Sequence, residues 1–143
     1  MGDPYARKLT NRTFFHAKTP IRGRVVVVLD GMLDNRGLNL IQPISRAFAH
    51  GSIIELIGTS EAQAAPGSTV ETIAYIAFVE LLDSGVLLVG DEIRWKDVSI
   101  GTIAGYDDTH MPNHQNTVVL MKDRMPGKAL GLSAGDEILI NGF

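Results

Sequence analysis

The stretch of this sequence best equipped for chemistry is a polar segment, residues 105–116, that separates two apolar runs. It contains His110 and His114, four residues apart, preceded by the carboxylates Asp107 and Asp108. Imidazole and carboxylate groups together suit zinc, iron or manganese. We therefore predict that a divalent metal ion binds here through His110, His114 and Asp108.

The same segment could instead hold a small ligand or do no chemistry. As a ligand site it would use its polar side chains, namely Asp107, Asp108, His110, Asn113, His114 and Asn116. As a catalytic metal site it would keep one coordination position open, with Asp108 as general base. As a structural loop it would use the same Asp, Asn, Thr and Pro residues as ordinary turn formers.

One familiar arrangement of two histidines is excluded. Four-residue spacing would place both rings on one face of a helix, but Pro112 lies between them and disfavours a helical Met111. The glutamate that follows the first histidine of the helical metalloprotease motif is also missing. The segment is therefore not the helical two-histidine motif of metalloproteases.

Other candidate residues are weaker. Asp30 and Asp34 could join a metal site if their loop lies near His110. The Gly-x-Ser-x-Gly pattern around Ser133 precedes a strand-like run rather than following one, and no histidine comes after it, so we expect a turn. We expect His50 to lie at the end of a helix, where the dipole favours its charge.

Apolar, β-branched runs separated by Gly, Asp and Pro turns dominate the rest of the chain. They predict many short strands and a mainly β fold, a small single-domain barrel with at most one or two short helices. One helix is expected near residues 43–50, after Pro43 and before Gly51. The predicted strands are residues 24–29, 52–57, 70–82, 86–89, 92–96, 98–104, 117–121 and 137–140.

Composition limits the class of protein. The chain has 143 residues and no cysteine, which excludes disulfides, thiolate metal sites and cysteine nucleophiles. No apolar run approaches the roughly 20 residues that span a bilayer. Residues 1–20 lack the apolar centre of a signal peptide, so we expect a cytoplasmic protein that does not bind membranes.

Charge is distributed unevenly along the chain. The first 24 residues contain six basic residues and one acidic residue, whereas the remainder contains seven basic and fifteen acidic residues. We predict a basic N-terminal arm over residues 1–20 and a barrel domain over residues 21–143. No nucleic-acid-binding module accompanies the arm, so no nucleic acid is expected. Phe14 and Phe15 predict that the arm docks on an apolar surface, which would make a homo-oligomer if that surface belongs to a second copy.

The second half of the chain resembles the glucitol/sorbitol-specific IIA component of the sugar phosphotransferase system, over Ile73 to Ile140. The motifs that carry the resemblance are Val89-Gly90-Asp91-Glu92-Ile93, Ser99 to Gly105, Asn116 to Leu120, Pro126-Gly127 and Gly135-Asp136-Glu137-Ile138. The resemblance implies a small β-barrel. That family carries phosphate on a histidine, and the comparable stretch here, Tyr75 to Glu80, contains none. The family's phosphoryl transfer is therefore not expected.

No convincing pair of base and nucleophile occurs in the sequence. We therefore favour a module that binds a metal or a small molecule at residues 107–116 over a metal-dependent enzyme at the same loop. The remaining alternative is a structural or assembly protein without chemistry.

Overall fold

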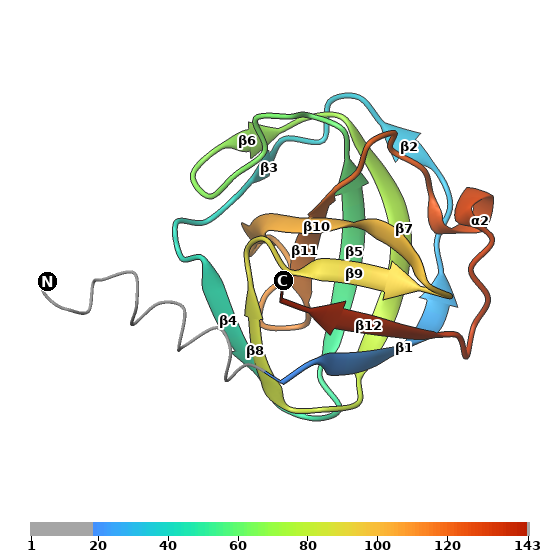
Figure 1. Ribbon diagram of the computed structural model, residues 1–143. Coiled ribbons are helices and arrows are strands. Elements are labelled where there is room, and N and C mark those ends of the chain that lie inside the picture. The colour runs from blue at the N-terminus through green and yellow to red at the C-terminus, as the bar shows by residue number, and fades with distance from the viewer. Residues whose placement is uncertain (1–18, 143) are drawn as a thin grey trace, which may run out of the picture.

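Seven strands close into a barrel in the computed structural model, which describes residues 19–142 (Figure 1). Around the ring the order is β1–β12–β9–β10–β11–β5–β7, and β7 pairs with β1 to close it. The strands are β1 (Ile21–Val28), β5 (Ile53–Thr59), β7 (Ile73–Leu81), β9 (Glu92–Trp95), β10 (Val98–Asp107), β11 (Gln115–Leu120) and β12 (Glu137–Asn141).

Shorter elements flank this ring. Two antiparallel pairs of strands that are distant in the chain, β3 (Leu38–Asn39) with β6 (Thr69–Val70) and β4 (Ser45–Phe48) with β8 (Gly85–Leu88), are separate two-stranded sheets. The strand β2 (Met32–Leu33) pairs with β7, and the short helix α2 (Gly127–Leu130) lies beside the ring (Figure 1). The predicted mainly β barrel with few helices is confirmed.

The buried apolar residues form two clusters, one in the interior of the barrel and one on a covered part of its outer surface. The larger cluster takes residues from every strand of the ring, such as Val25, Ile54 and Tyr106, and forms the interior. The smaller cluster joins Leu38 of β3 and Val70 of β6 to outward-facing residues of the ring. The β3–β6 pair is thus packed on the outer surface of the barrel.

The helix predicted for residues 43–50 is wrong. Ser45–Phe48 form strand β4, antiparallel to β8, and Ser45 lies opposite Leu88 in the register. His50 lies at the turn that leads into β5 and is exposed, so it does not end a helix. The ladder with β8, some 40 residues away, outweighs the local helical preference of Arg46 and Ala47.

One pairing in the ring is parallel and positions the candidate site. The strand β11 runs parallel to β5, with Gln115 opposite Ile54 and Asn116 opposite Glu55. Ile54 belongs to the interior cluster, so Glu55 points to the outer surface, because side chains alternate along a strand. The loop between β10 and β11 enters beside this outward-facing glutamate.

The expectations for the N-terminal arm fall mostly outside the described residues. Phe14 and Phe15 lie in residues 1–18, which the structure does not describe. In the described part, residues 19–142, no helix is long and apolar enough to cross a membrane.

The Glu61 carboxylate provides a prediction about acid stability. It accepts hydrogen bonds from the backbone N–H and hydroxyl of Thr72 at 2.6 and 2.7 Å and from the Glu71 N–H at 2.9 Å. The bond from the Thr72 N–H is the main cause that lowers the Glu61 pKa. Stabilisation by this carboxylate is therefore complete above the unfolded pKa of about 4.3, and it disappears as the pH falls through the lower folded pKa.

We expect Glu61→Gln to lower the melting temperature at pH 7 and to have a shrinking effect as the pH falls from about 5 to 3. Thermal unfolding of both proteins across that range measures the difference. Equal differences at every pH would show that ionisation of Glu61 does not contribute.

Candidate metal centre

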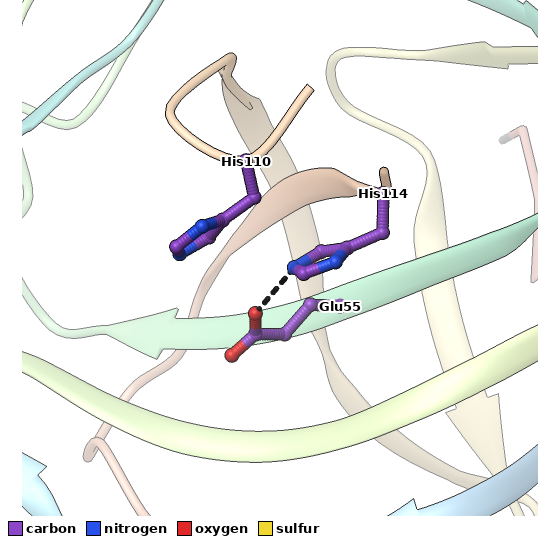
Figure 2. A group of neighbouring side chains, drawn as sticks. All are labelled: Glu55, His110 and His114. Atoms are coloured by element: carbon purple, nitrogen blue, oxygen red, sulfur yellow. Dashed lines mark hydrogen bonds and ion pairs between the residues drawn. The ribbon is translucent and has the colours of Figure 1, made fainter. Parts of the chain in front are cut away.

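Glu55, His110 and His114 bring their ligating atoms together on the outer surface of the barrel. Each offers one ligand atom, and these atoms all lie within 4.8 Å of one another. Figure 2 shows Glu55 rising from β5 toward the two imidazole rings, which come from the loop that leads into β11. The group therefore combines two residues of the loop 107–116 with a third, Glu55, from β5.

The contact between His114 and Glu55 is the closest in this group. His114 Nε2 lies 3.0 Å from Glu55 Oε1, and the two side chains are 12% and 8% exposed. Phe78 packs edge-on against the His114 ring, with centroids 5.0 Å apart. The Asn113 amide nitrogen lies 3.2 Å from His114 Nδ1. Contacts on three sides thus hold the His114 ring in place.

His110 is the exposed member of the group. Its ring lies 5.0 Å from that of His114 between centroids, tilted by 31°. The loop turns sharply between them, with His110 O accepting hydrogen bonds from Asn113 N–H at 2.9 Å and His114 N–H at 3.2 Å. A turn, rather than a helix, therefore brings the two rings to the same place.

Asp107 anchors the start of the loop. It is 3% exposed and accepts hydrogen bonds from Thr109 N–H, Asn39 N–H and Asn116 Nδ2. Burial raises the pKa of Asp107, but these hydrogen bonds outweigh it and hold the pKa below its usual value. An ionised Asp107 thus connects the loop to β3 and β11.

Asp108, the predicted carboxylate ligand, bonds elsewhere. Its Oδ1 accepts hydrogen bonds from Arg46 Nη2 and Gln115 Nε2, each at 2.8 Å. In the described part of the chain the carboxylate that accompanies His110 and His114 is Glu55 instead. The spatial group therefore contains two of the three residues predicted to bind metal.

The other weak candidates have structural partners. Asp34 Oδ1 lies 2.6 Å from Arg124 Nη2, and Asp30 Oδ1 accepts the N–H of Gly31. Ser133 N–H donates to Asp136 Oδ2 in the turn before β12, as expected for a turn. None of these three residues joins the group of Glu55, His110 and His114.

Comparison with known proteins places the chain in a family. The model of DUF6917, a family of unknown function, matches residues 15–141. The chain belongs to DUF6917. Searches of curated proteins and of solved structures returned no match. All three residues of the candidate centre fall within the matched range of this DUF6917 chain.

These findings leave the phosphotransferase resemblance without support beyond the barrel itself. The family match is to DUF6917, and the ring of seven strands agrees with the barrel that the resemblance implied. Strand β7, which contains the stretch from Tyr75 to Glu80, has no histidine. Within residues 19–142 of this DUF6917 chain, the histidines whose rings lie near one another are His110 and His114 of the candidate centre.

Glu55 is the residue that the sequence analysis missed. It lies in the apolar run Ser52 to Ile57, whose pattern predicts a strand and nothing more. A charged residue in the middle of a β-branched run is itself a signal, because charged residues are rarely buried without a partner. The sequence does not reveal that this partner is His114, 59 positions away.

Proposed function

We propose that this protein is a metal-binding module that holds a divalent ion between Glu55, His110 and His114. The observation that supports it is the convergence of three ligand atoms within 4.8 Å. Ligands that share an ion at about 2.0–2.2 Å lie at most about 4.4 Å apart, so the group is close to the spacing that a bound ion requires. His110 is the exposed member of the group, so its side chain has the most room to move toward an ion.

The donor set indicates which ions fit. Two imidazole nitrogens and one carboxylate oxygen suit zinc, iron or manganese, whereas magnesium and calcium prefer oxygen ligands alone. The chain contains no cysteine, so no thiolate competes for the ion. Zinc is favoured, because a loop and a strand can offer it ligands without the octahedral geometry that manganese or iron often takes.

The surroundings of His114 support a ligand role. Histidines that bind metals usually hydrogen-bond through their second ring nitrogen, which fixes the tautomer and the ring orientation. The Asn113 amide occupies that position at 3.2 Å from Nδ1, which leaves Nε2 directed at Glu55. Rotation of the amide would let it accept from Nδ1 when Nε2 binds metal.

The first test compares metal content in the wild type and in His110→Ala. We expect untagged wild-type protein to hold close to an equimolar amount of zinc, iron or manganese by elemental analysis. His110→Ala should lose most of it. Because His110 is exposed, the metal-free variant should melt at nearly the same temperature as the metal-free wild type.

His50→Ala is the matched control for that variant. His50 is also an exposed histidine in a turn, but it lies outside the group. It should keep the wild-type metal content. Wild-type protein that takes up none of the three metals after incubation would overturn the proposal, as would equal metal loss in both variants.

A further inference from the structure

Asn116 contains a buried oxygen atom that lacks a hydrogen bond. The residue is 0% exposed, and its amide nitrogen donates to Asp107 Oδ1 at 3.1 Å. Its amide oxygen, Oδ1, has no hydrogen-bond partner. A buried amide oxygen in this condition costs free energy unless a donor or a cation reaches it.

The position of Asn116 places it beside the candidate metal centre. It is registered opposite Glu55 across the parallel pair β11 and β5, and neighbouring strands lie about 5 Å apart. His114 lies two residues earlier, immediately before β11, and its Nε2 lies 3.0 Å from Glu55 Oε1. Asn116 therefore adjoins two of the three residues of the centre.

We propose that Asn116 Oδ1 is the fourth ligand of the metal held by Glu55, His110 and His114. This inference rests on the proposed function. Side-chain amide oxygens are established ligands of calcium, and the same oxygen lone pairs can bind another divalent ion beside two imidazoles and a carboxylate. The proposal also explains the buried oxygen, since the ion is the partner that Oδ1 lacks.

Asp107 orients the amide for this role. Because Asp107 Oδ1 accepts from Asn116 Nδ2, the nitrogen of the amide is committed and the oxygen is left for the metal. Asp107 is fixed in turn by the backbone N–H groups of Asn39 and Thr109. Partners in the outer shell of a metal site commonly hold ligands in this way.

Four protein ligands have a chemical consequence. A tetrahedral ion such as zinc would be saturated by two imidazoles, a carboxylate and an amide oxygen. Saturated sites retain metal and support the fold, whereas catalytic zinc sites keep one position for water or substrate. The proposed ligand set therefore assigns retention of the ion, rather than metal-dependent catalysis, to this barrel.

Cobalt(II) in place of zinc tests the fourth ligand, because its visible absorption reports its ligands. We expect the spectrum of the wild-type cobalt protein to be unchanged by added azide. Asn116→Ala should open a coordination position, so its spectrum should shift with azide. Its cobalt affinity should also fall by about tenfold or more, the minimum seen when even outer-shell partners are removed.

Thr117→Val is a matched control for Asn116→Ala. Thr117 is the next residue, is equally buried at 0% exposure, and its hydroxyl also lacks a hydrogen-bond partner. It points to the opposite side of β11, away from the centre. This variant should bind cobalt as tightly as the wild type and should stay insensitive to azide.

The outcomes separate this inference from the proposed function. Wild-type protein that binds neither cobalt nor zinc overturns both. Wild-type protein that binds cobalt and responds to azide overturns the fourth ligand alone. This measurement uses the wild type, so it does not depend on whether a variant folds. Equal cobalt affinity in Asn116→Ala and Thr117→Val would overturn the fourth ligand as well.

Discussion

His114→Ala should abolish metal binding and destabilise the metal-free barrel at the same time. The side chain of Glu55, 8% exposed, would remain buried without the bond from its carboxylate to the imidazole at 3.0 Å. Loss of a hydrogen bond to a charged group costs about 1.5–3 kcal/mol, so we expect the free energy of unfolding to fall by about 2–3 kcal/mol. Urea denaturation and elemental analysis measure the two effects.

Adding Glu55→Gln to His114→Ala separates the loss of stability that comes from the buried Glu55 charge from the loss of metal binding. In the double variant Glu55→Gln with His114→Ala, no charge is left buried, so part of the lost stability should return. Metal binding should remain absent, because two ligands are missing. If His114→Ala were as stable as His110→Ala, the pair of Glu55 and His114 would contribute nothing to the fold.

Gly127→Ala should lower the free energy of unfolding by more than Gly135→Ala or Glu61→Gln. A Cβ atom at Gly127 would overlap the backbone carbonyl group of Ile76 and lie 3.3 Å from the carbonyl oxygen of Leu29. The helix α2 therefore begins in direct backbone contact with β7. Overpacking usually costs 1–3 kcal/mol, and a backbone obstacle yields less than a side chain, so we expect about 3 kcal/mol or more.

A second glycine provides the comparison for Gly127→Ala. Gly135 has a φ of +95° and open space around its Cβ position, so Gly135→Ala should cost only backbone strain, about 1 kcal/mol. Thermal unfolding should show a melting temperature for Gly127→Ala well below that of Gly135→Ala. Equal losses would mean that α2 moves away from β7 at little cost.

Most strands of the ring could be predicted from the sequence, because each is a short apolar run with turn residues at its ends. The predicted runs 92–96 and 137–140, for example, correspond to Glu92–Trp95 and Glu137–Asn141. Strand β4 could not be predicted, because its residues favour a helix locally and become a strand only through pairing with the distant β8. The helix α2, four residues long, has too few residues to show a helical period.

The candidate centre could be predicted in part for a similar reason. His110 and His114 are close in sequence, and their loop stands out by composition. Glu55 comes from another strand, and the register of the parallel pair, not any local pattern, brings it to His114. Asp108 precedes the histidines in sequence, but Arg46 and Gln115 take up its carboxylate.

The place of β12 in the ring has a consequence for the order in which the barrel can assemble. β1 has β12 on one side and β7 on the other, so the first strand of the ring pairs only with strands that are synthesised after it. During synthesis, β1 cannot gain its second neighbour until residues 137–141 have left the ribosome. Until then the apolar interior stays accessible along one seam, where a chaperone or another nascent chain can reach it. Closure of the barrel is therefore a late, long-range event, as expected for folds rich in distant contacts.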